Sequence, residues 1–165
     1  MRRLLVTLVA VTVACSPTTD PTTTPPPSSG TCTQPPASEV DAPSALDIRV
    51  EPALTTPLGE ALLVVASEGL PERALAGVDA GWQCWDGAQW VTTHIVYRGF
   101  GSNPGQTIPV NQEFQIRVPS IGLDLDQGYP IVIPPVDPGT YRIEDEIIVD
   151  DGTVPGFVIV EVVAA

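Results

Sequence analysis

Short apolar stretches recur along residues 45–163, and most of them alternate apolar and polar positions with a period of two. Leu46, Ile48 and Val50, for example, alternate with charged residues, whereas no stretch keeps the period of a long amphipathic helix. The pattern predicts strands at residues 46–51, 60–66, 82–85, 89–98, 114–118, 129–133, 140–149 and 157–163. About eight strands at this spacing are typical of an all-β fold, an antiparallel β-sandwich.

Turn residues separate the predicted strands. Asp86-Gly87 and Asp150-Asp151-Gly152 are signals for hairpin connections. One short helical turn is expected within 68–80, and the glycine-rich segment 99–112 is expected to form a projecting loop. Asp145 interrupts an alternating strand, which predicts a bulge or an edge position there.

The N-terminus has the pattern of a secretory signal. Arg2 and Arg3 precede an apolar stretch at 4–14, which is too short to span the hydrocarbon core of a membrane as a helix. The stretch ends at Thr12-Val13-Ala14-Cys15, which resembles a bacterial lipobox, although Thr12 replaces the usual leucine.

That resemblance implies a signal peptide at 1–14 and a membrane anchor on Cys15. The anchor would be a thioether-linked diacylglycerol on Cys15, usually joined by a further acyl chain such as palmitate on its amine, and two or more chains give stable anchoring. The alternative is an ordinary secreted protein that is cleaved nearby, with Cys15 incidental.

Residues 15–44 are rich in Pro, Thr and Ser and contain little that could form a core. We expect a disordered tether that spans about 90 Å when extended and about 30 Å as a coil. Its Ser/Thr-Pro composition also allows O-linked sugar.

Two cysteines remain once Cys15 is lipidated, and a pair outside the cytosol predicts a disulfide between Cys32 and Cys84. The bridge would be worth up to about 4 kcal/mol in the chain-entropy model, and it would fix the end of the tether to the domain. Two free thiols or an intermolecular bridge are the alternatives.

Residues 138–141, Pro-Gly-Thr-Tyr, place Tyr141 at the start of a late strand. This arrangement matches the tyrosine corner of immunoglobulin-like sandwiches, and Trp82 or Trp85 would be the tryptophan of the central strand. The chain from about residue 80 to 163 resembles bacterial immunoglobulin-like domains through the segments 85–91 and 138–143. The resemblance implies an immunoglobulin-like domain at 45–163 that is displayed at the cell surface and is not an enzyme.

The charge balance restricts the partners. Seven basic residues, all arginine, oppose 20 acidic residues, for a net charge of −13. Such a surface repels phosphate, so nucleic acid and anionic lipid headgroups are poor partners.

Little in the sequence indicates catalysis. His94 is the only histidine; it is predicted to share a strand face with Trp90, Thr92 and Val96, and no nucleophile motif accompanies it. We expect no metal and no cofactor. The acidic clusters at 144–146, at 150–151 and at Asp124 with Asp126 are expected to be solvated, with a Ca²⁺ site as the weaker alternative. Trp85 and Trp90 are candidates for a contact surface, because aromatic side chains anchor interfaces.

These observations favour a binding or structural module of the cell envelope, anchored by lipid outside the cytoplasmic membrane. Its partner would be an envelope protein or a polysaccharide. An inhibitor or accessory subunit that presents the 99–112 loop to an enzyme is the alternative, and an envelope hydrolase is a minor one.

Overall fold

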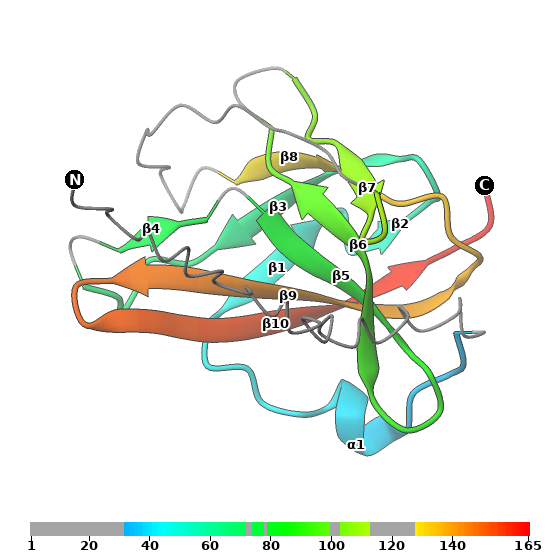
Figure 1. Ribbon diagram of the computed structural model, residues 1–165, viewed down its shortest axis with the longest axis horizontal. Coiled ribbons are helices and arrows are strands. Elements are labelled where there is room, and N and C mark those ends of the chain that lie inside the picture. The colour runs from blue at the N-terminus through cyan, green and yellow to red at the C-terminus, as the bar shows by residue number, and fades with distance from the viewer. Residues whose placement is uncertain (1–31, 72–73, 78, 100–102, 113–127) are drawn as a thin grey trace, which may run out of the picture.

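The computed structural model describes residues 32–71, 74–77, 79–99, 103–112 and 128–165, and within them the chain forms two β-sheets packed face to face (Figure 1). The smaller sheet has the order β1-β3-β8, with β1 at Ile48–Glu51, β3 at Glu60–Val65 and β8 at Tyr129–Val132. The larger sheet has the order β2-β10-β9-β5-β6-β7, and β4 also pairs with β9. Its strands are β2 (Leu54–Thr55), β4 (Leu75–Ala76), β5 (Asp79–Trp85), β6 (Trp90–Tyr97), β7 (Thr107–Pro109), β9 (Gly139–Val149) and β10 (Gly152–Val162). The predicted all-β fold with two packed sheets is confirmed.

The core lies between the inner faces of the two sheets. Ile48, Val50 and Leu63 of the smaller sheet and Trp82 and Ile143 of the larger sheet are all buried there. Ile48 and Val50 show the spacing of two that places alternate residues of a strand on one face, which explains why the alternating pattern predicts the layers. Strand β3 lies between β1 and β8, and its last three residues are buried, although Leu62 remains 39% exposed.

The chain crosses between the sheets just after β1. A cis Glu51-Pro52 peptide bond follows β1, and β2 then runs parallel to the end of β10. The other neighbour of β10 is β9, and these two strands form a long antiparallel hairpin, with pairs from Gly152↔Val149 to Val162↔Gly139.

No helix is assigned in the described part of 68–80, and residues 72, 73 and 78 lie outside the described residues. The described part has two tight turns, closed by Leu70 N–H to the Ser67 carbonyl and by Ala74 N–H to the Pro71 carbonyl, and then β4. The structure instead has a short helix, α1 (Ala37–Val40), inside the segment assigned to the tether.

The bulge predicted at Asp145 is absent, because β9 and β10 keep continuous register through the Asp145↔Gly156 pair. The side chain of Asp145 points into the core instead. The register shifts between β5 and β6, where Trp82 pairs with His94 but Gln83 pairs with Thr92. Since direct partners share a face, His94 and Thr92 lie on opposite faces, and the prediction that they share one is wrong.

The described part of the segment 99–112 is attached to the smaller sheet at its base. The backbone N–H groups of Gly99 and Gly105 both donate to the Pro130 carbonyl, at 2.8 and 2.9 Å, and Thr107 begins β7 beside β6. A Cβ atom on residue 105 would lie 1.6 Å from the Tyr97 carbonyl oxygen, so glycine permits this close return. These bonds fix the base of the segment beside β8; residues 100–102 lie outside the described residues, so the projecting loop stays a prediction.

Several predicted features lie outside the described residues. They are the signal peptide at 1–14, Cys15, the tether as far as residue 31, the strand at 114–118, and Asp124 with Asp126.

Candidate functional site

The structure contains the predicted disulfide. Cys32 and Cys84 are bonded, with 5.5 Å between their Cα atoms and 52 residues between them in sequence. Cys84 belongs to the core on β5, whereas Cys32 is exposed. The bridge therefore fixes the first described residue of the chain to the body of the sandwich.

Residues 32–46, which we call the strap, continue from this bridge across the outer face of the larger sheet. Thr33 forms a β-bridge with Trp85 and donates its N–H to the Trp85 carbonyl at 2.8 Å. The Gln34 side-chain amide donates to Thr140 Oγ1 at 2.8 Å. Figure 1 shows α1 next to the turn between β5 and β6.

The far end of the strap lies against β10. Ser44 Oγ accepts the Phe157 N–H at 2.9 Å, and Leu46 packs so closely on Gly156 that a Cβ atom there would lie 2.6 Å from the Leu46 side chain. These contacts cover part of the outer edge of β10, which would otherwise be open to pairing with another strand. Most of the strap had been assigned to the tether by its composition.

Apart from the bridge, the strap is held by a few hydrogen bonds and by two buried residues near its ends, Pro35 and the core residue Leu46. No residue of α1 is buried, and no side chain caps its N-terminus. Each hydrogen bond contributes about 1 kcal/mol net, whereas ordering the backbone costs about 1–2 kcal/mol per residue. The strap has more residues than such contacts, so its docking depends strongly on the disulfide.

A stack of three side chains lies under the strap. The Arg142 guanidinium lies between the Trp90 and Phe157 rings, with its Cζ 4.9 and 5.0 Å from their centroids. Trp85 packs edge-on against Trp90, at 5.6 Å between centroids, and the Trp90 indole N–H donates to Glu39 of α1 at 3.2 Å. Such stacks are favoured by the attraction of a cation to ring faces.

The two tryptophans predicted as a contact surface therefore differ in their access. Trp85 is buried, with 9% of its surface exposed, while Trp90 is partly buried under Glu39. Trp85 offers a partner almost no area while the strap is docked. Trp90 offers part of one ring.

A polar ladder continues the stack along the same face. Arg142 Nε donates to Gln83 Oε1 at 2.6 Å, and the Gln83 amide donates to Glu144 and to Thr92. Burial lowers the pKa of Arg142, and nearby Glu144 and Glu39 partly counteract that effect. The hydrogen bond to Gln83 fixes the guanidinium between the two rings.

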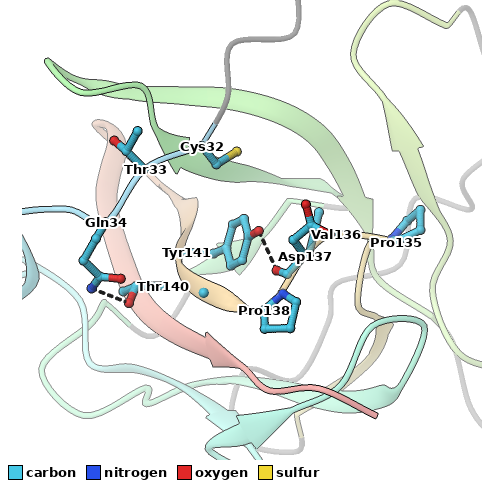
Figure 2. A pocket seen from close by; sticks show the side chains of 10 residues that line it. Cys32, Thr33, Gln34, Pro135, Val136, Asp137, Pro138, Thr140 and Tyr141 are labelled. Carbon is cyan, nitrogen blue, oxygen red and sulfur yellow. Dashed lines mark hydrogen bonds between the residues drawn. The ribbon is translucent and has the colours of Figure 1, made fainter.

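A pocket of about 360 Å³ opens where the strap meets the start of β9 (Figure 2). Cys32, Thr33 and Gln34 form one wall, and the segment Pro135–Tyr141 forms the other. The Tyr141 hydroxyl donates to the Asp137 carbonyl at 2.7 Å, four residues upstream. This is the bond that a tyrosine corner requires, and the same ring packs on Trp82 at 5.1 Å between centroids.

The hydroxyl of Tyr141 gives a direct test of that corner. We expect Tyr141→Phe to lower the free energy of unfolding by about 1 kcal/mol, because the Asp137 carbonyl loses its donor. Urea denaturation measures the change. A variant as stable as the wild type would show that the hydroxyl does not stabilise the corner.

Arg98 and Asp145 form an ion pair inside the core, which the sequence pattern does not predict. Both side chains are fully buried, and Arg98 also donates to the Gly77 carbonyl and lies 5.6 Å from the ring centroid of Tyr129 on the smaller sheet. Burial raises the pKa of Asp145, and the neighbouring Arg98 opposes that rise. The expectation of a solvated acid is therefore wrong for Asp145, while Glu144 and Glu146 are exposed as expected.

His94 lies on the inner side of β6, partly buried, with its Nδ1 atom 3.0 Å from Thr93 Oγ1. Burial lowers its pKa below the ordinary value of 6.5. The unfolded chain consequently binds more protons just below pH 6.5, so stability should fall as the pH decreases through that value.

Unfolding measured between pH 8 and 5 tests this expectation for the wild type and for His94→Gln. The variant should lose the part of the pH dependence that begins near 6.5. Buried Asp145 contributes equally to both proteins and cancels in the difference. Identical pH profiles would rule out the assigned burial effect on His94.

Other features of the described residues add no reacting group. These residues contain no cluster of three or more His, Cys, Asp or Glu side chains placed to hold a metal ion. None of their helices has the length and apolar character needed to cross a bilayer.

No protein family, curated protein or solved structure matches the sequence.

Proposed function

We propose that this protein is an immunoglobulin-like binding module of the cell envelope, anchored by lipid on Cys15 outside the cytoplasmic membrane. The Cys32–Cys84 bridge is the main support for a location outside the cytoplasmic membrane, because disulfides persist in oxidising compartments. The third cysteine, Cys15, then lies directly after the signal-like apolar stretch, where a lipid anchor is expected.

The strand order supports an immunoglobulin-like assignment. Strands β10, β9, β5 and β6 correspond in order to G, F, C and C′ of a variable-type domain, and β1, β3 and β8 correspond to A, B and E. Buried Trp82 lies on the C-like strand, and Tyr141 lies near the start of the F-like strand with its hydroxyl bonded upstream.

The charge of the described surface supports a basic protein as the partner. Each of the arginines in the described residues is engaged, Arg49 with Glu51, Arg98 with Asp145, and Arg142 with Gln83. Carboxylates remain exposed along the β9–β10 hairpin, at Glu144, Glu146, Asp150 and Asp151. A complementary basic surface would associate quickly and with the correct orientation.

Carbodiimide cross-linking on intact cells tests this proposal. The reagent couples carboxylates to amines, and the chain has no lysine, so its side-chain carboxylates can react only with its own N-terminal amine, where that is free, or with an amine of another molecule. We expect one protein adduct that disappears when the four hairpin acids are replaced by their amides. A control variant with Asp47→Asn and Glu68→Gln should keep it.

Two results would contradict the proposal. One is the absence of any adduct, and the other is an adduct that survives the hairpin variant unchanged. An adduct with amines of the cell-wall polysaccharide would replace the protein partner with a polysaccharide.

A further inference from the structure

We propose that the Cys32–Cys84 bridge is a site of thiol–disulfide exchange whose reduction releases the strap from the outer face of the larger sheet. The two sulfur-bearing residues differ in access. Cys32 is exposed and lines the pocket of about 360 Å³ shown in Figure 2, whereas Cys84 is only 2% exposed. We therefore take the Cys32 sulfur as the point of attack by an incoming thiolate.

The exchange needs a dithiol reductant. Its first thiolate attacks the Cys32 sulfur, the Cys32–Cys84 bond breaks, and Cys84 leaves as a thiolate that takes up a proton. The second thiol of the reductant then attacks the mixed disulfide and frees Cys32. Two electrons pass from the reductant, which becomes a disulfide, to the protein, which gains two thiols.

The strap is built to separate from the sandwich once the bridge opens. Between its buried ends at Pro35 and Leu46, it belongs to neither sheet except for the single Thr33↔Trp85 bridge, and no residue of α1 is buried. The pairs that hold β5, β6, β9 and β10 together do not involve it. Reduction should therefore free the strap while the two sheets stay intact, and it should uncover Trp90 and Arg142.

Release would also change how far the module reaches, a consequence that rests on the proposed lipid anchor at Cys15. With the bridge closed, residues 16–31 can span at most about 50 Å at about 3.1 Å per residue. With the strap free, residues 16–46 can span about 95 Å. The bridge thus sets both how much of Trp90 is exposed and how far the domain can lie from the membrane.

Hydrogen exchange on the mature chain with Cys15→Ser tests strap release without depending on the anchor. We expect dithiothreitol to raise exchange at Thr33, Val40 and Asp41 by at least about tenfold while β9 and β10 stay protected. Acrylamide quenching of tryptophan fluorescence should rise in parallel. Oxidised dithiothreitol is the control and should change nothing.

Cys32→Ser gives the same test without a reductant, because it removes the bridge at an exposed position. It should show the fast strap exchange from the start. A strap that stays protected in the reduced protein and in this variant would overturn the proposal. So would loss of protection in β9 and β10 together with the strap, since the bridge would then hold the whole domain.

Discussion

Replacing Asp145 by Asn should lower the free energy of unfolding by about 3–5 kcal/mol, the largest effect expected for a single substitution in this protein. The substitution keeps the shape of the side chain but removes its charge, which leaves the guanidinium of Arg98 buried without a counter-ion. Both side chains are fully buried in the structure, so water cannot compensate. Urea denaturation at pH 7 measures the loss.

Two further variants make this test specific. Glu146→Gln changes the neighbouring exposed acid and should alter stability by less than about 0.5 kcal/mol. The double variant Arg98→Met with Asp145→Leu removes both charges and should regain most of the loss, because an apolar pair pays no desolvation penalty. If Asp145→Asn is as stable as Glu146→Gln, the pair is not buried in the way described.

Removing the disulfide should lower the free energy of unfolding by about 2–4 kcal/mol, since the closed loop no longer restricts the unfolded chain. Cys32→Ser is the suitable variant, because residue 32 is exposed and the core residue Cys84 is kept. The comparison is made in the Cys15→Ser background, so that no other thiol can pair.

Peptide mapping gives the matching control for that measurement. Trypsin cuts only after arginine here, so non-reducing digestion of the mature chain should join peptide 15–49 to peptide 74–98. Finding the two peptides separate, with both thiols alkylated, would contradict the bridge. A Cys32→Ser variant with unchanged stability would show that the bridge contributes nothing to folding.

The alternating pattern predicted most of the strands because each sheet buries one face. Ile48 and Val50 on β1, and Ile143 and Ile147 on β9, are buried at spacings that follow this rule. The short strands β2, β4 and β7 were missed, since two or three residues carry no readable period. Their pairing is fixed by longer neighbours in space and not by their own sequence.

The buried ion pair could not be predicted from local sequence. Asp145 lies between two glutamates and resembles part of a solvated acidic run, and Arg98 lies 47 residues away at the end of another strand. The alternation of the strand did contain a signal for burial, because Asp145 has the same spacing of two as the inward-facing Ile143 and Ile147. An acid at an inward position indicates a buried partner as readily as a bulge.

The strap was misassigned for a related reason. Its Pro, Thr and Ser content is typical of a disordered tether, and only Cys32 indicated attachment. Thr33, Gln34 and Glu39 contact residues more than 50 positions away, so no local sequence pattern predicts these contacts. Composition therefore indicated that this segment has little tendency to fold by itself, but it could not show that the disulfide holds the segment against the larger sheet.

The intact mass of the protein purified from its own cell envelope shows whether Cys15 carries the lipid anchor. We expect a chain of residues 15–165 that carries a diacylglycerol on Cys15, usually with one further acyl chain, and that contains one disulfide. A mass for an unmodified chain that begins at Met1, or at any residue other than Cys15, would contradict the anchor.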